Sequence, residues 1–147
     1  MKKPRLYLDV CCFNRPFDDQ SQPLIWMETQ AILLIKEEIE KGTLELVWSY
    51  MIDLENSKNP DVQRQKAVFD WWDLATKDVE ASEQVLKTAT DVQKSGVHLN
   101  DSLHVACAIV AECDYFISTD KRLLKKPING IVLLNPLGLI QLKEPTK

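Results

Sequence analysis

The sequence has few of the residues that mark flexible chains, with 4 glycines and 7 prolines among 147 residues. Long disordered stretches are therefore not expected. It has no apolar run long enough to span a bilayer. Its first ten residues, MKKPRLYLDV, contain no small-residue cleavage site of the kind that ends a signal peptide. We expect a cytoplasmic protein without a membrane partner, folded as a single domain over residues 1–147.

Cysteine and histidine are also scarce. The cysteines do not have the spacing of a zinc site, and a cytoplasmic setting disfavours disulfides. We interpret them as small apolar residues near the core; they are Cys11, Cys12, Cys107 and Cys113. The only histidines are His98 and His104. Chemistry that needs no catalytic cysteine or histidine is therefore favoured.

Positive charge is in deficit, since 18 lysines and arginines face 22 acids and leave a net charge of −4. Proteins that bind nucleic acid mainly by electrostatics are usually basic. The overall charge therefore counts against a nucleic-acid ligand. It is compatible with one if many of the acids share a pocket in which metal ions reverse the local field.

Apolar runs and helical spacing alternate along the chain. Strands are expected at 5–10, 44–49, 115–119 and 131–134. Helices are expected at 23–41, 50–57, 61–76, 81–95 and 99–113, with a loop at 11–22 and a basic turn at 121–126. Strands that alternate with helices predict an α/β domain with a mostly parallel sheet.

Four acids are predicted to meet at one edge of that sheet, the carboxyl ends of the strands, where α/β proteins bind ligands. Asp9 ends the first strand, and Asp120 lies just past the third. Asp101 opens the helix that leads into the third strand. Glu55 lies in the short helix that leaves the second. The directions of these elements place all four acids at the same edge.

Each acid also has an ordinary structural interpretation. Asp101 could cap its helix, with Asn100 as a competing cap. Asp120 could be a turn residue, and Glu55 an exposed helical glutamate. Asp9 is different because it interrupts an apolar strand, where burying a charge is costly without a cation or partner.

Crowded carboxylates repel one another, and a divalent ion relieves the repulsion. Magnesium prefers hard oxygen ligands and keeps several waters, which leaves room for phosphate oxygens. Such a site can activate a bound water for attack on a phosphodiester. His104 lies on nearly the same helical face as Asp101. It either ligates the metal, orients Asp101, or is a packed, hydrogen-bonded histidine.

These residues resemble the PIN-domain family of metal-dependent ribonucleases. The segments that carry the resemblance are 6–9 (LYLD), 49–55 (SYMIDLE), 100–108 (NDSLHVACA) and 116–120 (FISTD). The resemblance implies a three-layer α/β/α fold with a central, mostly parallel sheet of four or five strands. It also implies a magnesium- or manganese-dependent endoribonuclease that acts on RNA, and a homodimer. Single-domain members of this length are often the toxins of type II toxin–antitoxin pairs, which implies an antitoxin partner.

By this resemblance the catalytic, metal-binding acids are Asp9, Glu55, Asp101 and Asp120. Ser118 is expected to support the last of them. After the first acid, many members have Thr and then Asn or Ser, whereas this chain has residues 10–12 (VCC). Polar support for Asp9 is then expected from Asn14.

Basic residues near the acids have two possible interpretations. Arg15 lies in the loop after the first strand, and Lys121 and Arg122 follow Asp120 directly. They either contact the RNA backbone beside the metal or belong to ordinary solvated surface.

Other functions fit the sequence less well. Phosphotransfer enzymes of the haloacid-dehalogenase type need a second acid two residues after the first, and position 11 is a cysteine. A receiver-like signalling domain needs paired acids early in the chain and a lysine after a late strand. The alternative that remains is a catalytically inactive PIN-like domain that binds RNA or protein.

Overall fold

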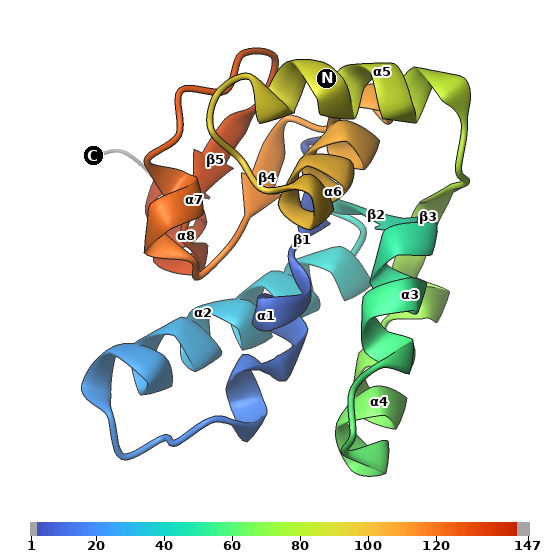
Figure 1. Ribbon diagram of the computed structural model, residues 1–147. Helices are drawn as coiled ribbons and strands as arrows, with labels where there is room; N and C mark the ends of the chain where they lie inside the picture. Colours follow the sequence, from blue (N-terminus) through green and yellow to red (C-terminus); the bar gives the residue numbers. More distant parts are fainter. Residues whose placement is uncertain (1–2, 144–147) are drawn as a thin grey trace.

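A parallel sheet forms the centre of the computed structural model, which describes residues 3–143 (Figure 1). The strands lie in the order β3-β2-β1-β4-β5, and every neighbouring pair is parallel. Their bounds are β1 Arg5–Leu8, β2 Glu45–Ser49, β3 Ala75–Val79, β4 Tyr115–Ile117 and β5 Val132–Leu134. The expected α/β class and mostly parallel sheet are confirmed.

Helices cover both faces of the sheet. The helices are α1 Val10–Asn14, α2 Pro23–Glu40, α3 Tyr50–Ser57, α4 Val62–Phe69, α5 Glu83–Gln93, α6 Leu99–Val110, α7 Lys121–Leu124 and α8 Pro136–Lys143, with 3-10 turns η1 Arg15–Phe17 and η2 Trp72–Leu74. Parallel crossovers are right-handed. The connection from β1 to β2 and the one from β3 to β4 run in opposite directions along the sheet. They therefore put α2 and α5–α6 on opposite faces, as Figure 1 shows.

The core is built on β1 and the helices against it. Leu6, Tyr7 and Leu8 are fully buried, as expected for the central strand of a sheet covered on both sides.

The long helix α2 begins at Pro23, which suits a first helical position. It is followed by Gly42, whose φ of +80° is a conformation that favours glycine. Three cysteines are buried and Cys11 is partly buried, all four as free thiols, which confirms the expected packing role.

Several expected boundaries were wrong. The helix expected at 61–76 ends at Phe69, and β3 follows as a fifth strand. The residues 76–78 of this edge strand are exposed, so they show no apolar run. The loop expected at 11–22 contains α1 and η1, and the expected basic turn is the short helix α7. The first strand ends at Leu8, so Asp9 follows it and caps α1.

Within residues 3–143, no helix combines the length and apolar character that a membrane crossing requires.

The packing of α2 predicts a contrast between neighbouring positions. Ile35 is fully buried, whereas Leu34 is 47% exposed. Ile35→Ala should lower the free energy of unfolding by about 2 to 5 kcal/mol, because it removes buried methyl groups and leaves a cavity. Leu34→Ala, on the same helix, should cost far less. Urea denaturation followed by circular dichroism measures both, and equal losses would contradict the described packing of α2.

Candidate metal centre

The candidate centre lies where the direction of the chain connections reverses, between β1 and β4. Ligands of open α/β sheets bind at the carboxyl ends of the strands beside such a point. Asp9 directly follows β1, and Asp120 is the third residue after β4. The Asp9 backbone N–H donates to the carbonyl of Ile117 at 2.9 Å, which extends the pairing of the two strands by one residue.

Asp9 is held on both carboxylate oxygens. Its Oδ1 accepts from the backbone N–H of Val10 at 2.9 Å, and its Oδ2 accepts from the hydroxyl of Ser118, also at 2.9 Å. Only 7% of the residue is exposed. Burial raises the pKa of Asp9 above its ordinary value, whereas the neighbouring His104 and the Ser118 hydrogen bond lower it. The charges of Glu55 and Asp101 raise it further.

Glu55 and His104 lie beside Asp9. Each of these three residues offers one ligand atom, and the three atoms lie within 4.8 Å of one another. Glu55 projects from α3, and its Oε1 is 3.0 Å from Nε2 of His104. His104 is fully buried on α6, so it is a packed, hydrogen-bonded histidine, and its acidic partner is Glu55.

Asp101 and Asp120 complete the set of acids across a neighbouring cavity. Asp101 lies in the first turn of α6, whose N-cap is His98, so neither Asn100 nor Asp101 caps this helix. Burial raises the pKa of Asp101, and the charge of Asp120 raises it further. The two acids line a cavity of about 270 Å³, together with Gly96, Val97, His98, Arg122, Leu123 and Lys126. They do not belong to the group of atoms within 4.8 Å.

The expected supporting residues lie partly elsewhere. Ser118 donates to Asp9 and accepts from the backbone N–H of Asp120 at 3.0 Å, so it contacts both acids. Asn14 was expected to support Asp9, but its amide donates to the carbonyl of Val10 and accepts from Asn59. Asp9 receives its side-chain support from Ser118 because β4 places that hydroxyl beside it.

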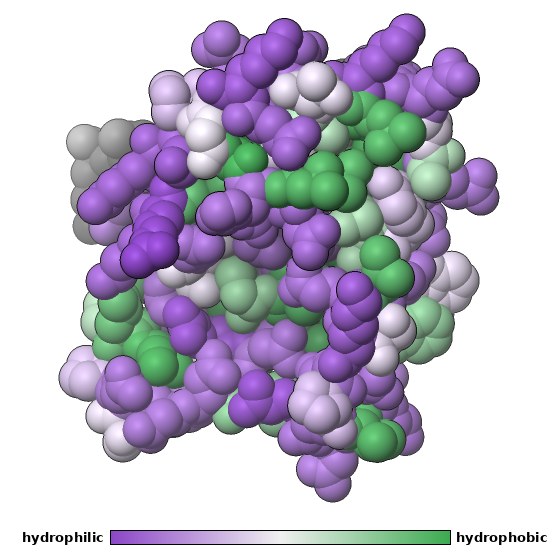
Figure 2. All heavy atoms as spheres, in the orientation of Figure 1, coloured by the Kyte–Doolittle hydropathy of each residue, from purple (hydrophilic) through white to green (hydrophobic). Residues whose placement is uncertain are grey.

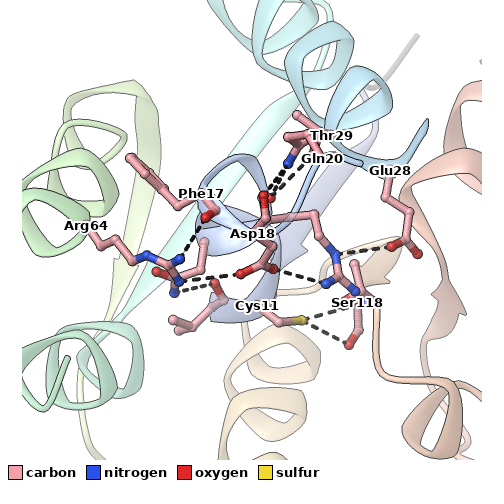
Figure 3. A network of polar contacts seen from close by, with 12 residues as sticks. Cys11, Phe17, Asp18, Gln20, Glu28, Thr29, Arg64 and Ser118 are labelled. Carbon is pink, nitrogen blue, oxygen red and sulfur yellow. Dashed lines mark hydrogen bonds and ion pairs between the residues drawn. The ribbon is translucent and has the colours of Figure 1, made fainter. Parts of the chain in front are cut away.

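Arg15 lies in an ion-pair network. Its guanidinium contacts Asp18 at 3.0 Å and the buried Glu28 at 3.1 Å. Arg64 contacts the other oxygen of Asp18 at 3.4 Å. Figure 3 shows Arg64 and Glu28 on opposite sides of Asp18. The carboxylates thus hold the Arg15 side chain in a structural network, and it does not line the cavity of Asp101 and Asp120.

The basic residues of α7 fall into two groups. Asp120 caps this helix by accepting from the backbone N–H groups of Arg122 and Leu123. Arg122 lines the acid cavity together with Lys126, which follows the helix, whereas Lys121 is exposed and lies outside the lining. The sequence alone does not distinguish Lys121 from Arg122, because the difference depends on the direction in which each side chain leaves a short helix.

The donor set fits a divalent cation. Carboxylate oxygens are the hard ligands that magnesium and manganese prefer. Asp9 and Asp101 both have raised pKa values, caused by burial and by neighbouring negative charge. A cation among these acids removes that penalty. Asp9, Glu55, Asp101 and Asp120 are therefore the residues that could hold it.

Comparison with solved structures shows a likeness of fold. The fold is similar to a chain in the crystal structure of VapBC2 from Rickettsia felis bound to a DNA fragment from their promoter, with a TM-score of 0.53 and 14% sequence identity. The alignment covers 89% of this chain and 98% of that chain. No family model and no curated protein matches the sequence. The PIN-like fold implied by the resemblance is thereby confirmed, and at this identity the likeness concerns the fold alone.

The repulsion among the acids predicts that a charge-removing substitution stabilises the metal-free protein. The pKa of Asp101 is raised on folding, so its ionisation at pH 7 costs the native state more than the unfolded chain. Asp101→Asn should therefore raise the midpoint of thermal unfolding at pH 7 in chelator. Glu83→Gln is the matched control, because Glu83 is an acid in the first turn of α5 away from this centre. A lower midpoint for Asp101→Asn than for wild type would contradict the described crowding.

Proposed function

We propose that this chain is a magnesium- or manganese-dependent endoribonuclease that hydrolyses RNA phosphodiester bonds, and that it acts as the toxin of a type II toxin–antitoxin pair. One observation carries the proposal: acids from four separate segments gather at the switch point of a PIN-like sheet. Asp9 and Glu55 lie together there, and Asp101 and Asp120 line the adjoining cavity.

The acids have different parts in the proposed reaction. Asp9 is the most firmly positioned, since Val10 and Ser118 hold its two oxygens. Asp101 and Asp120 project from the starts of α6 and α7. These three residues and Glu55 would hold the cation. When bound, the cation supplies an activated water and stabilises the leaving oxygen. The chain itself orients the ligands, two of which, Asp101 and Asp120, line the cavity.

RNA would approach along the basic residues of that cavity. Arg122 and Lys126 line this cavity together with Asp101 and Asp120. Within residues 3–143, neither side chain makes an ion pair. Cations without a protein partner are available to backbone phosphates, which position a nucleic acid without reading its sequence. Local positive charge beside a cation-loaded acid cluster reconciles an RNA substrate with the net charge of −4.

A protein partner is also part of the proposal. Large apolar side chains are exposed on α2, namely Leu24, Trp26, Met27, Leu33 and Leu34. Figure 2 shows an apolar patch at the lower left, over this helix. Such patches mark surfaces that contact other proteins. An antitoxin or a second copy of the chain would cover it, and the shared fold with a VapBC2 chain supports the first of these.

Removal of one metal-binding acid should greatly reduce cleavage. Because a catalytic cation contributes several kcal/mol to the transition state, and each 1.4 kcal/mol is a factor of ten in rate, Asp101→Asn should lower kcat/KM at least about 100-fold. Purified protein is incubated with structured and single-stranded RNAs in manganese, in magnesium or in chelator. Wild type should cleave only with a divalent ion.

The control for this assay is Asp91→Asn, which removes an acid that is 76% exposed on α5. It should cleave RNA as wild type does. If wild type and Asp101→Asn are equally inactive while the RNA is still bound, the chain is a binding module of PIN-like fold. If they are equally active, the acids are not the catalytic centre.

The proposed phosphate contact of Arg122 makes a separate prediction. Each cation that neutralises a phosphate of single-stranded RNA contributes about 0.7 to the slope of log affinity against log salt. Arg122→Ala should therefore weaken RNA binding at low salt and flatten the salt dependence by about that amount. Lys87→Ala, an exposed change on α5, should leave the slope unchanged. Fluorescence anisotropy with labelled RNA in chelator measures both. An unchanged slope for Arg122→Ala would remove this residue from the RNA path.

A further inference from the structure

A buried chain of hydrogen bonds connects the centre of the sheet to the acids. The Tyr7 hydroxyl lies 2.6 Å from the hydroxyl of Ser49 and 2.6 Å from Nδ1 of His104. Nε2 of His104 then lies 3.0 Å from Oε1 of Glu55. Ser49, Tyr7 and His104 are fully buried. Since buried polar groups need partners, the positions of the hydrogens along this chain can be worked out.

The direction of the chain is set at Ser49. Its oxygen caps α3 by accepting from the backbone N–H groups of Met51 and Ile52. Those two donors occupy its lone pairs, so its own hydrogen must be donated. The thiol of Cys107 lies nearby, but burial raises its pKa to about 11, and a neutral thiol is a weak acceptor. The Ser49 hydroxyl therefore donates to the oxygen of Tyr7.

The donation from Ser49 determines the direction of the hydrogen bond between Tyr7 and His104. Burial raises the pKa of Tyr7 well above its ordinary value, so it keeps its single hydroxyl hydrogen. The Tyr7 oxygen already accepts from Ser49, and its other hydrogen-bond partner is Nδ1 of His104. The phenol therefore donates to Nδ1. A neutral imidazole that accepts at Nδ1 carries its hydrogen on Nε2.

We propose that His104 is a positioning residue that donates its Nε2–H to Glu55 and is not itself a ligand of the metal. The proposal rests on the metal centre proposed above. Both nitrogens of His104 are engaged, one by Tyr7 and the other by Glu55, so neither offers a lone pair to a cation. The proximity of His104 to Asp9 and Glu55 then reflects orientation of the carboxylate.

Glu55 benefits from such a partner because its side chain is long and partly in solvent. Its side chain is 46% exposed, and a long exposed side chain loses rotamer freedom when it is held in one place. The hydrogen bond from a rigid, buried imidazole restricts this freedom before the cation binds. Removal of a group that orients a metal ligand in this way commonly lowers metal affinity or activity. The Ser49–Tyr7 pair, by fixing the tautomer, keeps the donor of His104 aimed at Glu55.

Nitrogen NMR of the imidazole tests the tautomer directly. In wild type labelled with ¹⁵N-histidine, the His104 ring should show a protonated Nε2 and an unprotonated Nδ1, both in chelator and in saturating magnesium. A protonated Nδ1 would overturn the proposal. Loss of the Nε2 proton on addition of magnesium would also overturn it, because His104 would then be a ligand.

Tyr7→Phe tests the effect on metal binding. The phenyl ring keeps the stacking of Tyr7 on Phe116 and removes only the hydroxyl. Manganese affinity, measured by calorimetry, should fall about 10- to 100-fold, the range seen when groups that orient metal ligands are lost. The Nε2–H tautomer of His104 should no longer be the main form in the nitrogen NMR spectrum. Thr29→Val, which removes a buried hydroxyl from α2, should leave both properties unchanged. Equal affinities in Tyr7→Phe and Thr29→Val would overturn the proposal.

Two substitutions of His104 separate the donor from the packing. Gln places an amide donor near the position of Nε2, whereas Leu fills space without a donor. His104→Gln should retain more manganese affinity than His104→Leu, and equal losses would contradict a positioning role. Failure of the ribonuclease function alone has a different result: wild type would bind manganese with the predicted tautomer and cleave no RNA. Absence of manganese binding in wild type would overturn both proposals.

Discussion

The parallel pairing of β1 with β4 is the constraint on which the centre depends. Its register sets Leu8 opposite Ile117, and the hydrogen bond from the Asp9 N–H to Ile117 extends the ladder past both strand ends. The residue after each strand is therefore brought to the same edge, so that Ser118 donates to Asp9. A slip of one residue would turn the side chains of one strand to the opposite face and separate this pair.

The centre is assembled at a cost to the metal-free fold. Burial and the charges of neighbouring acids raise the pKa values of Asp9 and Asp101. Ionisation of either carboxyl group therefore costs more free energy in the folded protein than in water. The backbone of Val10 and the hydroxyl of Ser118 offset part of this penalty at Asp9. A divalent cation bound among these acids would remove the penalty. The crowding itself is thus a physical argument for a cation.

Much of the fold could be predicted because its signals are local. The bounds of α2 follow from Pro23, helical spacing and Gly42, and α3 occupies the predicted residues. The strand β3 was missed because it is an edge strand whose residues 76–78 are exposed, so burial does not impose an apolar pattern on it. The short helix α1 was missed because its cap is Asp9, whose place depends on the neighbouring strand.

The sequence by itself determines which acids are present. It also determines that the directions of the strands and helices bring these acids to one edge of the sheet. The partners of each acid were decided by the tertiary structure. Ser118 serves Asp9 as well as Asp120, His104 faces Glu55, and Arg15 is held in ion pairs. The physical reason is that the directions of strands and helices follow from local patterns. Each of these contacts instead requires two atoms from segments far apart in the sequence to lie within about 3 Å of each other. Only the register of the sheet and the packing of α3 and α6 against it determine that distance.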